Sequence, residues 1–262
     1  MTGAPIIAPP TAAIPQKGST DPAPIKPRME TIFPTIEPVA VPINSAGANI
    51  KWVGKRTCQI VGVNSLKETS YTIMGDRIEA GTFCVAATLT KGNLLIKGFD
   101  PKIIKTELEL LKKIGAKIKT NKDEIHIKGP QKIKKISNLV TKEYGGFPTD
   151  LAPQFMVLLC KANGRSSITE NIFQNRFMHA MELQRLGAKI SIKNNKATIE
   201  GSTNFIGAEV MSSDLRASAA LILAGISAKG TTVVSRVYHC DRGYEKIENK
   251  LKKIGAKIRR LN

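Results

Sequence analysis

The sequence is built from a unit of roughly seventy residues that recurs four times. The tetrapeptide Gly-Ala-Lys-Ile, with Asn for Lys in the first copy, begins at Gly47, Gly115, Gly187 and Gly255, at intervals of 68, 72 and 68 residues. A second glycine precedes each tetrapeptide by 23 to 29 residues, at positions 18, 92, 164 and 230. Two marks that keep their spacing over four copies predict a repeat protein, so the repeat must be interpreted before any single motif.

Each copy predicts the same order of helices and strands. An apolar stretch of helical length, such as residues 155–162, is expected to end at the glycine that precedes the tetrapeptide, here Gly164, in a left-handed conformation. A short β-type run such as 167–169 follows. The next helix is amphipathic, because apolar residues recur three and four positions apart, as at Ile104, Leu108, Leu111 and Ile114.

The Gly-Ala pair closes this amphipathic helix and opens a strand, and an alternating run such as 124–127 supplies a second strand. A strand before the next apolar helix, at 71–74 or 208–211, completes a β-α-β-α-β-β unit. We therefore predict an α/β (α+β) fold, in which three units close around buried helices with their sheets outward.

The first and last copies are incomplete. Residues 1–43 hold ten prolines, which remove backbone donors and clash with the preceding turn, so regular helices are not expected there. We expect most of this segment to be disordered. In the fourth copy, residues 255–262 supply one strand, so the last sheet is expected to lack a member and to leave an unpaired edge.

Composition narrows the class of protein. No apolar run reaches the roughly 18 residues that span a membrane, and residues 1–23 lack the pattern of a signal peptide. Cys58, Cys84, Cys160 and Cys240 have no metal-ligand or redox spacing, which favours buried reduced thiols and a cytoplasmic protein. The net charge of +19 raises nucleic-acid binding as an alternative, but only 5% of residues are aromatic and no recognition motif accompanies the lysines.

An aspartate begins the first helix of each intact copy. Asp76 and Asp214 are interpreted as helix caps. Asp150 differs because it follows Gly145-Gly146-Phe147-Pro148-Thr149, a loop that can present a carboxylate to a ligand hydroxyl. A cap and a ligand contact stay equally open for Asp150.

Three arginines form the second candidate group. Arg176, Arg216 and Arg242 lie near helix starts, where a planar guanidinium and free backbone N–H groups suit a carboxylate or phosphate. The alternative is three structural ion pairs with Asp214, Asp241 or Glu245. His179 is interpreted as a packing residue with satisfied hydrogen bonds rather than as a catalytic base.

Five segments occur in an order typical of one family. They are Asp76-Arg77-Ile78-Glu79-Ala80-Gly81-Thr82-Phe83, Gly146 to Asp150, Ile168 to His179, Asp214-Leu215-Arg216-Ala217-Ser218-Ala219 and Asp241-Arg242-Gly243-Tyr244-Glu245. Together, over residues 46–262, they resemble the C-terminal half of the bacterial UDP-N-acetylglucosamine 1-carboxyvinyltransferase family. The resemblance implies two lobes of three such units each, arranged as inside-out α/β barrels, of which this chain holds one.

The resemblance also implies a reaction. An enolpyruvyl group passes from phosphoenolpyruvate to the 3-hydroxyl of UDP-N-acetylglucosamine, with release of phosphate, as the first committed step of peptidoglycan synthesis. Asp150 matches a residue that contacts the reacting sugar and is a candidate base, and Ile172 matches a contact to the sugar nucleotide. Arg216 and Arg242 match arginines on the phosphoenolpyruvate side, and Arg176 matches a further basic residue of the cleft. We expect no cofactor and no metal ion.

The remaining parts of the family site have no counterpart here. The family's proton donor lies on a loop of the other lobe, and none of the four cysteines has that context. We expect residues 1–45 to be a degenerate remnant, 46–75 to be strands from the other lobe, and 76–262 to be the C-terminal lobe, in units 76–145, 146–212 and 213–262. Alone, the chain is expected to be inactive; the alternative is a non-enzymatic remnant or a half that a separate N-terminal lobe complements.

Overall fold

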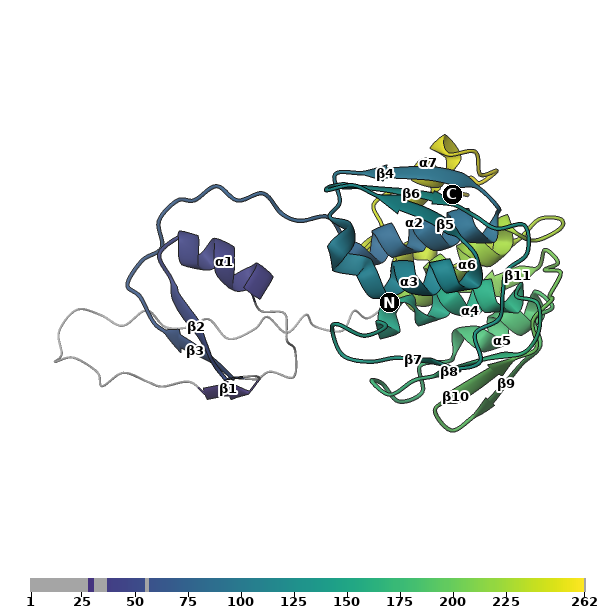
Figure 1. Cartoon of the computed structure of the whole chain (residues 1–262), viewed down its shortest axis with the longest axis horizontal. Coiled ribbons are helices and arrows are strands. Elements are labelled where there is room, and N and C mark those ends of the chain that lie inside the picture. The colour runs from purple at the N-terminus through teal and green to yellow at the C-terminus, as the bar shows by residue number, and fades with distance from the viewer. Residues whose placement is uncertain (1–27, 31–36, 55–56, 262) are drawn as a thin grey trace, which may run out of the picture. The chain divides into compact units, whose positions relative to one another are not determined.

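The structure is a computed structural model that describes residues 28–30, 37–54 and 57–261 (Figure 1). The backbone falls into two compact units, with the division after Ser70. Within the described ranges, no helix is both long enough and apolar enough to cross a membrane.

In its described residues, the first unit is a small antiparallel sheet with one helix. Strands β1 (Arg28–Glu30), β3 (Thr57–Val61) and β2 (Asn49–Gly54) pair in that order, and helix α1 is Glu37–Ser45. The prediction that prolines exclude a regular helix is wrong for residues 37–45. Pro38 lies in the first turn, where its missing N–H has no helical partner, and Pro42 removes only one internal bond. The disorder expected for the rest of 1–43 concerns residues 1–27 and 31–36, which lie outside the described ranges.

The Gly-Ala pair has the same structure in all four copies. Each glycine adopts the left-handed backbone conformation, with φ of 98° at Gly47, 115° at Gly115, 96° at Gly187 and 102° at Gly255. Its N–H donates to the carbonyl three residues back, and the alanine N–H donates to the carbonyl five residues back, at 3.0–3.1 Å for the alanine. These bonds are the Schellman motif, which satisfies the last carbonyls of a helix and reverses the chain. The tetrapeptide therefore marks a helix end, as predicted.

The second unit repeats one order of elements. Its helices are α2 (Arg77–Leu89), α3 (Lys105–Ile114), α4 (Ala152–Cys160), α5 (His179–Arg185), α6 (Leu215–Ile226) and α7 (Ile247–Lys253), with 3-10 turns η1 (Pro101–Ile104), η2 (Thr149–Leu151) and η3 (Val237–Arg242). Its strands are β4 (Asn93–Lys97), β5 (Lys117–Thr120), β6 (Glu124–Lys128), β7 (Leu139–Val140), β8 (Ser166–Thr169), β9 (Ile190–Lys193), β10 (Lys196–Ile199), β11 (Glu209–Met211) and β12 (Val233–Ser235). The predicted fold class is confirmed.

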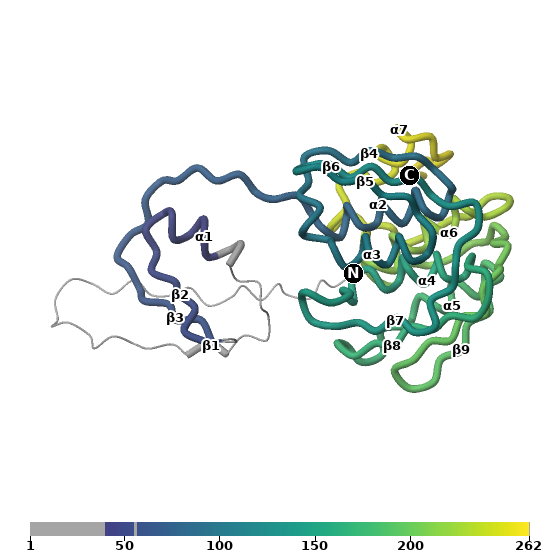
Figure 2. Tube along the Cα trace, in the orientation of Figure 1, coloured from purple at the N-terminus to yellow at the C-terminus, as the bar shows by residue number. Residues whose placement is uncertain are grey.

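The sheets lie outside and the apolar helices inside (Figures 1 and 2). The sheet orders are β4-β6-β5, β7-β8-β10-β9 and β11-β12. β7 pairs with β8, and β11 with β12, in parallel, so a buried helix connects each parallel pair. Such a connection must cross the face of the sheet, which places α4 and α6 against it.

Helices α2, α4 and α6 form the centre of the core. Every residue of α4 is buried, and residues 217–224 of α6 are buried without a break. A helix that is apolar all round is stable only where other elements cover every side. The amphipathic helix α3 covers part of it, with Leu108, Leu111 and Ile114 facing inward as predicted.

A hydrogen-bonded triad lies between these helices. Gln154 Nε2 donates to Thr82 Oγ1 and to the Tyr244 hydroxyl, both at 3.1 Å, and the two hydroxyls are 2.9 Å apart. The three side chains are buried. Since buried polar groups are costly without partners, the triad fixes how the three repeats meet.

Three local predictions are wrong. Residues 71–74 form no strand, and their side chains are exposed. Residues 256–261 also form no strand. In both places no described strand offers the backbone partner that a β-conformation requires. At the end of α2, Lys91 (φ 57°) rather than Gly92 takes the left-handed conformation.

The helix caps make a testable prediction. At Gly187, an added Cβ would meet only the Asn204 carbonyl oxygen, at 3.8 Å, so the cost of substitution is conformational. We expect Gly187→Ala to lower the free energy of unfolding by about 1–2 kcal/mol in urea denaturation. Gly187→Asn is the matched control and should lose less, because asparagine tolerates this region; equal losses would contradict the explanation.

Candidate functional site

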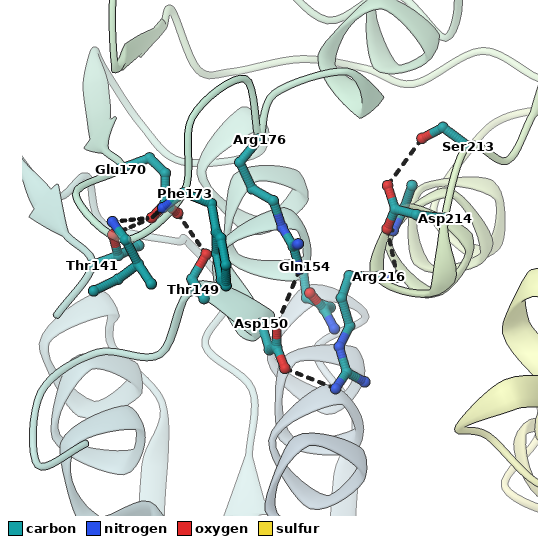
Figure 3. Close-up of polar contacts among 12 residues, drawn as sticks. Thr141, Thr149, Asp150, Gln154, Glu170, Phe173, Arg176, Ser213, Asp214 and Arg216 are labelled. Carbon is teal, nitrogen blue, oxygen red and sulfur yellow. Dashed lines mark hydrogen bonds and ion pairs between the residues drawn. The ribbon is translucent and has the colours of Figure 1, made fainter. Parts of the chain in front are cut away.

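Asp150 lies between two arginines from different parts of the chain (Figure 3). Its Oδ1 accepts from Arg176 Nη2 at 3.0 Å, and its Oδ2 accepts from Arg216 Nη2 at 2.9 Å. The side chains are partly exposed, at 35% for Asp150, 29% for Arg176 and 15% for Arg216. The structure therefore brings together three of the residues selected from the sequence, on a surface that a ligand can reach.

The backbone explains how Asp150 comes to face outward. Asp76 and Asp214 cap α2 and α6, since each carboxylate accepts two backbone N–H bonds of the first turn. Among the described residues Asp150 caps no helix: it lies inside η2, after Pro148, and its carboxylate oxygens accept from the two arginines alone. The question left open by the sequence is thus settled against a cap for Asp150, and the cap interpretation is confirmed for the other two.

Arg216 is fixed by its place in the first turn of α6. Its backbone N–H donates to Asp214 Oδ1 at 2.8 Å, and its side chain extends to Asp150. Burial alone would lower the pKa of Arg216, but Asp150 and the neighbouring Tyr244 outweigh burial and raise it. The guanidinium therefore stays charged at all working pH values.

Arg176 is carried by the loop between β8 and α5. Its guanidinium carbon lies 5.2 Å from the centre of the Phe173 ring, a cation–π contact on the same loop. Ile172 and Phe173 are 36% and 46% exposed. The loop thus offers an apolar surface directly beside the Asp150–Arg176 pair.

Asp214 adds a further negative group at the start of α6. Burial alone would raise its pKa, but the bonds from the Ala217 N–H, the Ser213 hydroxyl and the Arg216 N–H, together with the charge of Arg176, hold that pKa below its usual value. Asp214 is therefore an ionised cap and not a proton donor.

Arg242 is not joined to this group. It is exposed at the end of η3, and in the described part of the chain its side chain makes no hydrogen bond or ion pair. The alternative of ion pairs with Asp214, Asp241 or Glu245 is wrong for Arg176 and Arg216, which pair with Asp150. Asp241 is instead bound by Arg260, at 2.9 and 2.6 Å.

His179 and the cysteines are buried. The Nε2 atom of His179 has no hydrogen-bond partner among residues 28–30, 37–54 and 57–261, so the expected satisfaction of this ring is wrong, and burial lowers the pKa of His179 to about 4. All four cysteines are free and buried, as predicted. Burial raises the pKa of Cys84 and of Cys160 to about 12. Across the described ranges, no three His, Cys, Asp or Glu side chains converge on a possible metal position.

Sequence reasoning missed three polar residues around Asp150. Thr149 and Glu170 hydrogen-bond to each other beside it (Figure 3). Tyr244 interacts with Arg216. Glu170 is buried although it follows a strand directly. A charged residue directly after a β-type run was the available signal, but its side-chain partners Thr141 and Thr149 are distant in sequence.

Solved structures with this architecture are enolpyruvyl transferases. NikO from Streptomyces tendae matches with a TM-score of 0.77 and 27% identity, over 87% of this chain and 55% of that one. EPSP synthase from Acinetobacter baumannii matches with a TM-score of 0.69 at 20% identity, which supports the fold alone. A family model described as EPSP synthase (3-phosphoshikimate 1-carboxyvinyltransferase) matches residues 29–251, and the chain belongs to this family.

Curated relatives narrow the resemblance. The UDP-N-acetylglucosamine 1-carboxyvinyltransferase of Pelagibacter ubique (strain HTCC1062) is 60% identical over 231 residues, which are 88% of this chain and 55% of that protein. The protein of the same name from Desulfosudis oleivorans (strain DSM 6200 / JCM 39069 / Hxd3) is 50% identical over 219 residues, 84% of this chain and 52% of that protein. The chain thus spans about half the length of these relatives.

The buried His179 predicts a pH dependence of stability. Its pKa is about 4 in the folded chain and 6.5 ordinarily, so the unfolded chain binds more protons between these values. The free energy of unfolding should therefore fall, by about 3 kcal/mol from this residue, as the pH drops from 6.5 to 4. Denaturation at several pH values should show a shallower slope for His179→Gln. The exposed His126→Gln is the control, and an unchanged slope for His179→Gln would contradict the prediction.

Proposed function

We propose that the chain supplies one wall of an enolpyruvyl transferase site, which moves the enolpyruvyl group of phosphoenolpyruvate to the 3-hydroxyl of UDP-N-acetylglucosamine and releases phosphate. The observation that carries the proposal is the Asp150 carboxylate held by Arg176 and Arg216. The names of the 60% and 50% identical relatives support this choice of substrates within the family.

Each residue fits one requirement of the reaction. The sugar hydroxyl must lose a proton when its oxygen bonds to the enol carbon, and the partly exposed Asp150 carboxylate is the candidate base. The carboxylate and phosphate of the other substrate need positive charge, which Arg216 and the exposed Arg242 supply. Ile172 and Phe173 offer an apolar surface to the sugar nucleotide.

The described residues do not supply every group. The methylene carbon must gain a proton in the addition step and lose one in the elimination step. The four cysteines are buried, so they are poor donors to a ligand at Asp150. Affinity for a small anion also depends on groups from both walls of a cleft. We infer that the 262-residue chain alone does not turn over. Its free cysteines suit the cytoplasm.

Ligand-dependent thermal unfolding tests the substrate assignment. Millimolar UDP-N-acetylglucosamine should raise the midpoint, because a ligand that binds only the folded state stabilises it. The shift should vanish in Arg216→Ala and persist in Arg165→Ala, whose side chain pairs with the exposed Glu200. A shift with 3-phosphoshikimate and none with the nucleotide sugar would instead favour the reaction named in the family description.

Complementation tests the division of labour. The chain mixed with the N-terminal half of a full-length relative should release phosphate from the two substrates, whereas either half alone should not. Asp150→Asn should abolish this turnover while leaving the mixed halves associated. Turnover by the chain alone would contradict the inference that a second wall is required.

A further inference from the structure

A buried carboxylate lies behind the candidate site. Glu170 is only 3% exposed, directly after strand β8. Its Oε1 accepts from the Thr141 hydroxyl at 2.8 Å and from the N–H groups of Ile172 and Phe173 at 2.7 and 3.1 Å. Its Oε2 accepts from the Thr149 hydroxyl at 2.7 Å. Both oxygens are therefore occupied by donors from three separate segments.

The backbone of Glu170 is anchored on its other side. Its N–H donates to the Asn195 carbonyl at 2.8 Å, and Asn195 Nδ2 donates back to the Glu170 carbonyl at 3.1 Å. Thr141 is fixed as well, since its N–H donates to the Thr169 carbonyl at 3.0 Å. The carboxylate is thus attached to the sheet β7-β8-β10-β9 and has little freedom to move.

The segments that Glu170 holds are those that carry the candidate site. Thr149 is the residue before Asp150, and both lie in η2. Ile172 and Phe173 form the loop on which Arg176 stacks. No direct hydrogen bond joins η2 to residues 172–173, so apart from the Arg176–Asp150 bond the two Glu170 oxygens are the support that η2 and this loop share (Figure 3).

The chemistry of Glu170 suits a positioning role. A buried carboxylate is costly unless its hydrogen bonds are complete, and here four donors converge on it. Removing it would leave the N–H groups of Ile172 and Phe173 and the hydroxyls of Thr141 and Thr149 without this acceptor. Small displacements of groups that hold a reacting carboxylate have large effects on binding and rate.

We propose that Glu170 is a positioning residue that sets the placement of Asp150 relative to the loop of Ile172 and Arg176. This inference rests on the proposed function, in which the loop and the Asp150 carboxylate contact the same ligand. Glu170 itself does not reach the ligand.

Two substitutions separate the hydrogen bonds from the charge. Glu170→Gln keeps an oxygen for the three donors at Oε1, and its amide can donate to the Thr149 hydroxyl. Glu170→Ala removes all four bonds. Glu200→Ala is the matched control, since Glu200 belongs to the same repeat and pairs with Arg165 on the surface. Thr149→Val removes only the bond beside Asp150.

Calorimetric titration with UDP-N-acetylglucosamine, at a temperature where each variant is folded, gives the first test. The Kd should rise at least about tenfold for Glu170→Ala and severalfold for Thr149→Val, and stay within about threefold for Glu170→Gln and Glu200→Ala. A lower unfolding midpoint with an unchanged Kd in Glu170→Ala would show a structural support only and would overturn the proposal. If Glu170→Ala does not fold, the Kd values of Thr149→Val and Glu170→Gln still decide whether Glu170 is a positioning residue.

Amide hydrogen exchange gives a second test that needs no ligand. In Glu170→Ala, exchange should accelerate at Ile172 and Phe173 and also at Leu151, whose N–H donates within η2 to Pro148. In Thr149→Val, only Leu151 should respond. Failure of the parent chain to bind the nucleotide sugar would refute the proposed function, and exchange would then decide the role of Glu170. Unchanged exchange at Leu151 in both variants would overturn the proposal that Glu170 positions Asp150.

Discussion

The burial of three apolar helices is the constraint on which the rest of this fold depends. Helices α2, α4 and α6 have no polar side to show to water, so sheets and amphipathic helices must enclose them. Their few polar side chains must then satisfy one another. Thr82 of α2 and Gln154 of α4 bond to each other and to Tyr244, which follows η3, although the Gln154 side-chain carbonyl oxygen has no partner among the described residues. Because the three residues come from different repeats, their bonds also set how the repeats are rotated against each other. The packing of this core thus determines both the stability of the fold and the rotation of the repeats against each other.

The candidate site results from this rotation of the repeats against each other. Asp150 belongs to one repeat and Arg216 to the next, and they meet because α4 and α6 pack side by side with their starts close together. The same helix-start position holds a capping aspartate in the other two repeats. In the middle repeat the Gly-Gly-Phe-Pro segment and η2 replace the cap geometry, which turns the carboxylate toward the arginines. The same position at a helix start therefore holds a capping aspartate in two repeats and a partly exposed aspartate in the middle repeat.

The predictable parts of the structure are those set by neighbours in sequence. Helix ends at the Gly-Ala pairs, the caps at Asp76 and Asp214, and the inward stripe of α3 follow from local hydrogen bonds and periodicity. The errors at Lys91 and at the proline-containing helix α1 are local, whereas the other errors involve distant partners. Residues 71–74 and 256–261 have strand-like sequences but no described strand beside them. The pairing of Asp150 with arginines 26 and 66 residues away, and the burial of Glu170, likewise depend on the packing of repeats, which no local pattern reports.

The pairing of one carboxylate with two arginines bears directly on the proposed chemistry. Each guanidinium uses a single nitrogen, Nη2, toward Asp150, while an arginine carries five N–H donors in a planar fork. An anionic ligand can therefore bind the remaining donors of Arg176 without separating the pair. Asp150 is meanwhile held by bonds to both of its oxygens, and its side chain stays 35% exposed. In the proposed function, charge binding and hydroxyl recognition would use this one bonded group, so a substitution at any of the three residues should alter both.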